Sequence, residues 1–319
     1  MNKKVFKSTN TNYLYMPKIK YERLFASSWK LLLKHKTIFV PNLFMISASI
    51  LWTLAYLAIS GILKLLIKNP TMVYNQIVLQ EQFRSFVGNN PIWAPLSLVI
   101  YMLLWFLTNV FFATIKYGMI KELILTGKTS LSKGYLFAKR YFATSMLVHM
   151  IRWLIIFGPI AALVVIFYII GTKTNSFILM TPIFIIAIIL LLVFAYIAYM
   201  MVRLLFIFPI MAFEELGALR SLKKDFHFVA SHVGHTIITW ILFLVVWAIY
   251  AIVRTPLGVI GNKAQNLFII ISTTVLITLL SLIKSVWENM FIFRAYAKGK
   301  DAQKRKVFKE DTSWMGLYK

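Results

Sequence analysis

The chain contains no cysteine and only 10 acidic residues among its 319. The missing cysteine excludes disulfides, thiol nucleophiles and Cys-ligated metals. Only three of the acids are aspartates, and none lies in a long apolar run, so the paired aspartates that hold Mg²⁺ in membrane phosphotransferases are missing. A GxxxxGK[ST] phosphate loop and an HExxH zinc motif are also absent. The sequence therefore predicts no cofactor, no metal site and no enzyme of these classes.

Long apolar runs dominate the chain instead. Hydrophobic residues make up 60% of it, and its mean hydropathy is +0.76. Each of six runs reaches or approaches the roughly 20 residues that cross a ~30 Å hydrocarbon core. This pattern predicts an all-α, polytopic membrane protein with six transmembrane helices. The predicted spans cover about 38–63, 95–115, 153–171, 181–206, 236–260 and 267–293.

Basic residues are concentrated in alternate gaps between these runs. Of the 35 Lys and Arg residues, 26 lie in four segments and five lie in the other three gaps. The positive-inside rule therefore predicts a protein of the cell membrane with both termini cytoplasmic. A nucleic-acid partner is not expected, because such proteins spread their cations through a polar chain. The predicted membrane domain covers 21–297, between basic cytoplasmic segments at 1–20 and 298–319. The four cation-rich segments are 1–37, 116–140, 213–235 and 294–319.

A similar basic and aromatic segment precedes each pair of predicted spans, at 25–39, 136–150 and 219–235. Apolar residues at helical spacing beside Lys and Arg favour a helix in the interface plane, with its cations facing anionic lipid headgroups. The sequence thus predicts three transmembrane hairpins, each led by a cytoplasmic interfacial helix. The alternative is that basic segments beside membrane spans resemble one another because topology demands it.

Lys284 and Glu288 lie four residues apart on one helical face, inside the sixth predicted span. Glu288 is the only acid within a predicted span, and ionisable groups at that depth are candidates for function. The pair can be a structural anchor or an ion-coupling site. Arg203 lies near the cytoplasmic end of its span and can reach the headgroups.

Glu214, Glu215 and Arg220 come close to the Glu-Glu-x-x-x-Arg motif of CAAX-type intramembrane proteases, but the arginine is one residue too far along. The motif also lies in a predicted cytoplasmic gap. His232 and His235 share a helical face and could bind a metal, although no third ligand stands at an obvious spacing. An intramembrane hydrolase is the weakest of the functional hypotheses.

The segment RLLFIFPIMAFEELGALRS, residues 203–221, resembles a signature of uncharacterised prokaryotic six-span membrane proteins. That family is similar to the membrane domain of glycerophosphoryl diester phosphodiesterases. The resemblance implies the six-span fold and no hydrolysis, because no phosphodiesterase catalytic domain is present. A bend at Pro209 would place Glu214 and Glu215 in the first turn of an interfacial helix, where its dipole favours acids. The matching residues are Arg203, Pro209, Glu214, Ala218, Leu219 and Ser221.

These features favour a non-enzymatic membrane module that organises lipid, with anionic headgroups as partners, or that organises a partner protein. The alternative is a transporter component that uses the Lys284–Glu288 pair, which predicts a polar cavity lined by Glu288. A hydrolase would need Glu214 and His232 to converge. The candidate functional or structural residues are Arg203, Pro209, Glu214, Arg220, Ser221, Lys284 and Glu288.

Overall fold

The computed structural model describes residues 19–68, 76–173, 183–263 and 267–315, and every regular element in these residues is a helix. Of the predicted basic segment 1–20, residues 1–18 lie outside these ranges. Of the predicted tail 298–319, residues 316–319 lie outside them. The elements are α1 (Tyr21–Lys34), the 3-10 helix η1 (Lys36–Phe39), α2 (Val40–Ile59), α3 (Ile62–Lys68), α4 (Gln76–Asn89), α5 (Trp93–Thr126), α6 (Leu131–Lys173), α8 (Ile183–Arg203), α9 (Ile207–Glu214), α10 (Ala218–Ser231), α11 (Val233–Lys263) and α12 (Leu267–Met315).

Six helices among the described residues are long and apolar enough to cross a membrane. This finding confirms the predicted number of long apolar helices, as expected for a membrane protein. Several of them continue well beyond the predicted spans. With 34 residues, α5 is about 51 Å long at 1.5 Å per residue, so its last turns extend past a ~30 Å apolar core. The candidate spans are Lys36–Ile59, Trp93–Thr126, Leu131–Val165, Ile188–Glu214, Val233–Gly261 and Phe268–Asp301.

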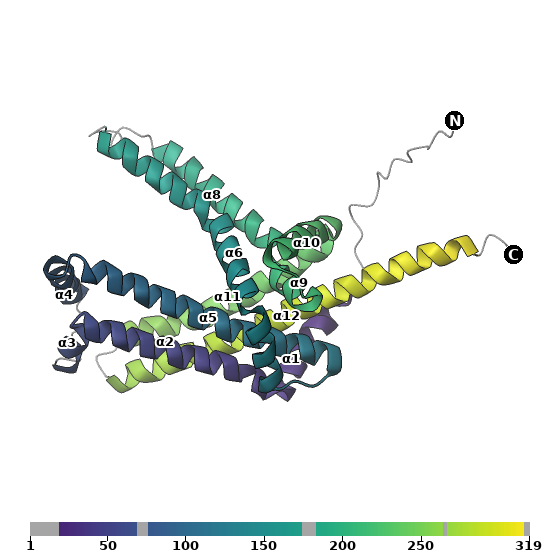
Figure 1. Ribbon diagram of the computed structural model, residues 1–319, viewed down its shortest axis with the longest axis horizontal. Coiled ribbons are helices and arrows are strands. Elements are labelled where there is room, and N and C mark those ends of the chain that lie inside the picture. Colours follow the sequence, from purple (N-terminus) through teal and green to yellow (C-terminus); the bar gives the residue numbers. More distant parts are fainter. Residues whose placement is uncertain (1–18, 69–75, 174–182, 264–266, 316–319) are drawn as a thin grey trace.

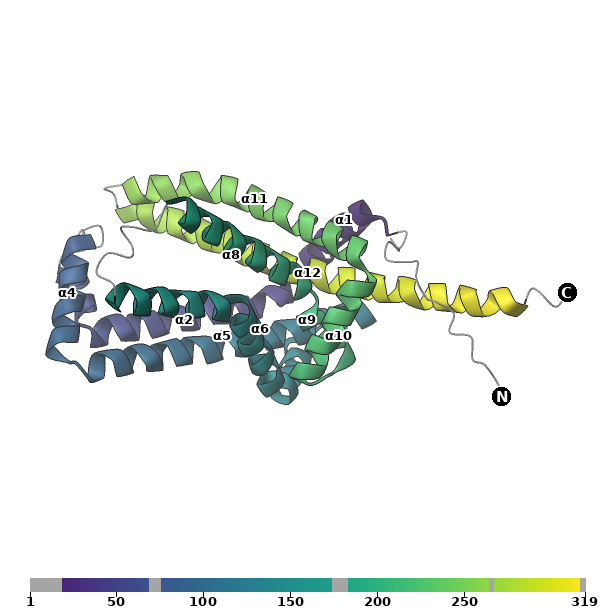
Figure 2. The same ribbon diagram turned by 90° about the horizontal axis from the view of Figure 1, so that it is seen from above.

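The long helices lie in pairs that separate toward one end of the molecule (Figures 1 and 2). Helix α2 runs alongside α5, α11 runs alongside α12, and α6 and α8 lean away as a third pair. The pairs meet near α9. Both views place α3 and α4 at one end and α1 and α10 at the other, where α12 projects beyond the bundle (Figures 1 and 2).

Two of the three predicted leading segments form separate short helices, and the third does not. Both α1 and α10 are amphipathic helices of 14 residues. Residues 136–150 instead belong to α6, which runs without interruption over 43 residues. The apolar side of α1 packs on α12, with the rings of Phe25 and Trp29 4.8 and 5.7 Å from the ring of Trp287. This side of α1 is therefore covered by protein.

Two glycines allow α5 and α6 to approach closely where α6 begins. A Cβ atom on Gly118 would lie 2.6 Å from Cβ of Phe137, and one on Gly134 would lie 2.5 Å from Cγ of Met119. Real Cβ atoms do not approach other atoms this closely, so neither position tolerates a side chain without a shift. This contact holds the predicted interfacial segment against α5.

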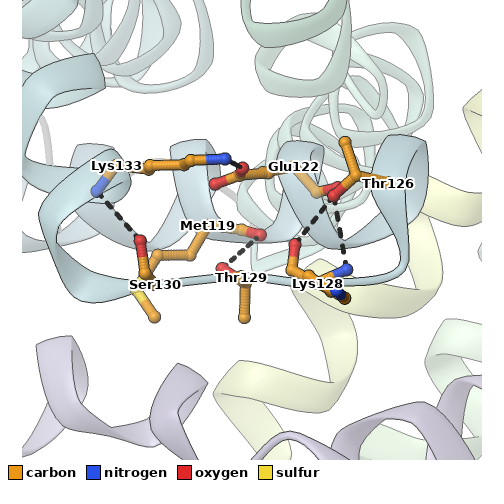
Figure 3. Close-up of polar contacts among 7 residues, drawn as sticks. All are labelled: Met119, Glu122, Thr126, Lys128, Thr129, Ser130 and Lys133. Atoms are coloured by element: carbon orange, nitrogen blue, oxygen red, sulfur yellow. Dashed lines mark hydrogen bonds and ion pairs between the residues drawn. The ribbon is translucent and has the colours of Figure 1, made fainter.

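The turn between α5 and α6 is closed by side-chain contacts (Figure 3). Gly127 ends α5 in the left-handed conformation, with φ of 73°, which glycine adopts without strain. The Thr129 hydroxyl donates a hydrogen bond of 3.0 Å to the Met119 carbonyl. Across the turn, Lys133 forms an ion pair with Glu122. These contacts fix the direction in which α6 leaves α5.

The fourth candidate span is broken earlier than predicted. Helix α8 ends at Arg203, a turn occupies 204–206, and Pro209 is the third residue of α9. Proline lacks an N–H and is tolerated in a first helical turn, so it starts the new helix instead of bending the old one. The expected position of Glu214 and Glu215 is consequently wrong. They end α9, and α10 begins only at Ala218.

Candidate functional site

A charged cluster lies between α5 and α12. Lys284 and Glu288 form an ion pair of 2.8 Å, as their spacing predicts, and each side chain is 13% exposed. The Lys284 ammonium also lies 4.1 Å from the ring centroid of Trp247 and 5.1 Å from that of Tyr250. Two aromatic faces and one carboxylate thus stabilise this cation.

Lys116 of α5 joins the same cluster. It is 4% exposed, and its Nζ lies 3.4 Å from Oγ of Ser285 on α12. Nδ2 of Asn42 on α2 lies at the same distance from that hydroxyl. Lys116 is close enough to Glu288 to interact with it electrostatically. The sequence assigns Lys116 to a cytoplasmic gap, and the only signal against this was the apolar run that continues after it.

Next to this cluster is a cavity of 390 Å³. Its walls come from α5, α6, α8, α9, α11 and α12, at the point where the α6–α8 pair meets the other helices (Figure 1). Most of its lining is apolar. The polar side chains that line it are Tyr117, Arg152, Glu288 and Asn289.

Arg152 places a second unexpected charge in this cavity. The sequence places Arg152 at the start of a span, where it needs no partner, but α6 begins at Leu131 and Arg152 lies well inside the helix. Its guanidinium carbon is 5.5 Å from the ring centroid of Phe208. Within the described residues, no hydrogen bond or ion pair engages this guanidinium.

Asp225 of α10 is fully buried and is close enough to Arg152 to interact with it electrostatically. Burial raises the pKa of its carboxyl group well above the ordinary value. The Phe206 N–H, Arg152 and Arg203 oppose this rise. The Phe206 N–H is close enough to favour the charged form, yet neither carboxylate oxygen has a well-formed hydrogen bond within the described residues. Sequence analysis missed Asp225, because an acid in a basic cytoplasmic segment suggests a solvated side chain.

The motif residues around α9 and α10 have structural roles. The Nε of Arg203 donates a hydrogen bond of 2.9 Å to the Tyr199 hydroxyl. Buried Ser221 donates to the Leu216 carbonyl at 3.3 Å and so holds the turn before α10. Arg220 is exposed, on the side of α10 away from the protein core.

Glu214 connects α9 to α10 and α12. Its carboxylate accepts hydrogen bonds from the Tyr296 hydroxyl at 2.9 Å and from Lys224 at 3.0 Å, and it pairs with Lys300. The acid lies at the end of α9, where the helix dipole disfavours negative charge. The two lysines compensate for this position.

Glu215 connects α9 to α5 and α6. It accepts hydrogen bonds of 2.6 Å from Lys121 and from Tyr141, and Arg140 lies at 3.6 Å. The hydrogen bonds from Lys121 and Tyr141 lower the pKa of this carboxyl group. Its φ of 52° places Glu215 in the left-handed region, which is unfavourable for a residue with a side chain. We call the two glutamates and their partners the glutamate clasp.

The histidines are engaged separately from the clasp. Nδ1 of His232 lies 2.9 Å from the Ser231 hydroxyl and 3.1 Å from the Phe228 carbonyl. His235 uses both ring nitrogens: Nε2 contacts the Ala295 carbonyl at 3.0 Å, and Nδ1 contacts the Tyr21 hydroxyl at 2.7 Å. In the described ranges, no three His, Cys, Asp or Glu side chains group in a way that could hold a metal ion.

Comparison with known proteins gives a family but no activity. No curated protein and no solved structure shows detectable similarity to the chain. A family model described as "Domain of unknown function (DUF7847)" matches residues 28–296. The match begins in α1, ends in α12 and includes the cluster, the cavity and every residue of the clasp except Lys300. The chain therefore belongs to the DUF7847 family.

Proposed function

We propose that the protein is a non-enzymatic module of the cell membrane that binds anionic lipids at its cytoplasmic side. The observation that carries this proposal is the position of the exposed cations. Most of the exposed cations among the described residues lie on α1, on α10 and around the turn between α5 and α6, at the end of the molecule opposite α3 and α4 (Figures 1 and 2). Anionic headgroups attract such a basic end. The exposed cations there include Arg23, Lys30, Lys34, Lys128, Lys133, Lys139, Arg220 and Lys223.

In this proposal the candidate spans cross the membrane as three hairpins, with both termini in the cytoplasm. Helices α1 and α10 then lie at the level of the cytoplasmic headgroups. The exposed side chains of Leu190, Leu191 and Phe194 on α8 support the placement of this helix in a membrane, because lipid tails would cover them. The proposal extends to the family resemblance of residues 203–221: the six-span family whose signature they resemble would be similar to the membrane domain of glycerophosphoryl diester phosphodiesterases, without their hydrolytic activity.

The test is enrichment of phosphatidylglycerol around the protein in mixed phosphatidylglycerol and phosphatidylcholine nanodiscs. We expect enrichment to fall as salt rises from about 0.05 to about 0.5 M, because salt screens exposed charges. A variant with Lys30, Lys34, Arg220 and Lys223 all changed to Gln should lose the enrichment. The matched control changes Lys64 and Lys68 of α3 to Gln and should keep it. No enrichment in the wild type, or equal loss in the control, would contradict the proposal.

A transporter component is the second candidate. The observation that favours it is that Glu288 lines the cavity beside Lys284. Proteoliposomes containing the wild type or Glu288→Gln distinguish the two functions. A solute or proton flux that disappears in Glu288→Gln would overturn the lipid-binding module. No flux in either protein, together with salt-sensitive lipid enrichment, would support it.

A further inference from the structure

We propose that the cavity holds the headgroup of one anionic phospholipid, with its phosphate bound by Arg152. This inference rests on the proposed function and deepens it, because it names a specific site and a ligand class beyond the basic surface. The argument uses the unpaired guanidinium, the charge balance around it, and the position of the cavity mouth.

The Arg152 guanidinium is the strongest indication of a missing partner. It lines the cavity from within a candidate span, and among the described residues it has a ring neighbour but no carboxylate within 4.0 Å. An arginine at such a position is costly unless something pairs with it. The planar fork of a guanidinium matches two oxygens of a phosphate group. A phosphate in the cavity would therefore satisfy this side chain.

The charges around the cavity favour an anionic ligand. Lys116, Arg152 and Lys284 supply three positive charges, and Glu288 supplies one negative charge that Lys284 already pairs with. Asp225 interacts with Arg152 electrostatically but forms no ion pair with it. The site thus has an excess of positive charge, which would repel a cationic ligand.

The mouth of the cavity indicates that the ligand is an amphiphile. Three lining residues are also exposed on the outer surface: Met201 of α8 is 41% exposed, and Leu244 and Trp247 of α11 are 41% and 46% exposed. The cavity therefore opens between α8 and α11, on a surface where many apolar side chains face outward. Its 390 Å³ accommodates a headgroup and the first part of the acyl chains, whose remainder would leave through this mouth.

The experiment is a titration of the full-length protein in neutral detergent micelles with phosphatidylglycerol, with bound lipids counted by native mass spectrometry. We expect one lipid to remain bound at about 0.5 M salt, because a buried pair is screened little. Arg152→Gln should weaken its Kd by about tenfold or more, since it removes a charge-assisted hydrogen-bonded pair. The matched control is Arg254→Gln, an exposed arginine in a candidate span, which should leave the Kd unchanged.

Two further measurements keep the proposal falsifiable if Arg152→Gln does not fold. Leu244→Trp should block the mouth and reduce binding while Arg152 stays in place. Diacylglycerol with the same acyl chains should not be retained, because it lacks the phosphate. Equal lipid binding by the wild type and a folded Arg152→Gln would overturn the proposal. Displacement of the lipid by about 10 mM inorganic phosphate would also overturn it, because free phosphate would then suffice as the ligand.

Failure of this inference and failure of the proposed function are distinguishable. The variant with four exposed cations changed should lose the salt-sensitive enrichment in nanodiscs and keep the tightly bound lipid. Arg152→Gln should do the reverse. Salt-sensitive enrichment in a wild type that holds no Arg152-dependent lipid would leave the proposed function intact and remove the cavity ligand.

Discussion

We call Lys116, Lys284 and Glu288, together with Arg152 in the adjacent cavity, the cavity cluster. The glutamate clasp and the cavity cluster both join several helices through charged side chains, but they differ in how completely their charges are paired. In the clasp, Glu214 contacts two lysines and Tyr296, and Glu215 contacts Lys121 and Tyr141. In the cavity cluster, Lys284 and Glu288 pair with each other, but Arg152 has no anionic partner within the described residues.

This difference separates charges that stabilise the fold from charges that are available to a ligand. Paired charges stabilise one another in the native structure. When one partner is removed, the remaining charge keeps its desolvation cost without the compensating attraction, so the folded state becomes less stable. An unpaired charge next to a cavity lowers stability unless a ligand binds. The clasp should therefore respond to mutation through stability, and the cavity cluster through ligand binding.

The largest expected effect is on the clasp. Glu214→Gln removes the charge that two lysines share. We expect a loss of about 2–3 kcal/mol in the free energy of unfolding, less than for a fully buried pair because solvent screens both partly exposed lysines. The measurement is thermal unfolding in detergent micelles. Glu22→Gln, an exposed acid on α1, is the matched control and should change stability little. Similar losses in both variants would mean that the clasp contributes no more than a surface charge.

A smaller loss is expected from the helix crossing next to the clasp. Gly134→Ala would place Cβ 2.5 Å from Cγ of Met119 and 2.9 Å from the Ile115 carbonyl oxygen, so α5 and α6 must move apart. We expect a loss of about 1–3 kcal/mol by overpacking, measured by the same unfolding experiment. Gly88→Ala is the control, because no atom lies within 4 Å of its added Cβ. Unchanged stability of Gly134→Ala would show that the crossing is not tightly packed.

Asp225 of α10 is buried without an ion-pair partner among the described residues, so its contribution to stability should respond to pH. Burial raises its pKa in the folded state, so its contribution to stability is most favourable at low pH and is lost as pH rises from about 4 toward the folded pKa. Asp225→Asn should therefore be more stable than the wild type at pH 8 by on the order of 1 kcal/mol, and nearly equal at pH 4.

The measurement for Asp225 is the difference in melting temperature between variant and wild type across this pH range. Asp301→Asn, an exposed acid on α12, should show no such trend. A variant of Asp225 that is less stable than the wild type at pH 8 would mean that the nearby arginines outweigh burial.

The smallest expected effect on stability comes from the cavity cluster. Lys116→Met replaces a buried cation by an apolar side chain of similar length, so we expect a change within about 1 kcal/mol, and a gain is compatible with this substitution. The comparison between the two regions would be broken by a loss as large as that of Glu214→Gln, because Lys116 would then be a structural charge.

Features that depend on one helix alone could be predicted from the sequence. The six predicted apolar runs correspond to six long apolar helices among the described residues. Lys284 and Glu288, which their spacing predicts to pair, form an ion pair of 2.8 Å. The amphipathic patterns near residues 25 and 219 became α1 and α10. These predictions succeeded because helical periodicity fixes which side chains share a face.

Features that depend on contact between helices could not be predicted. The sequence placed Lys116 in a gap, Arg152 at the start of a span and Glu214 at the start of a helix, and the structure differs at each of them. The leading segment at 136–150 is part of α6, which packs closely on α5 where Gly118 meets Phe137.

The sequence by itself determined the helical class, the number of long apolar helices and the uneven distribution of cations. The tertiary structure alone decided that Tyr21 meets His235, that Glu214 meets Tyr296 and that Arg152 faces a cavity. The physical reason is that hydropathy and helical spacing act along the chain. Contacts between residues 82 or 214 positions apart depend instead on how helices cross and rotate, which the local pattern does not specify.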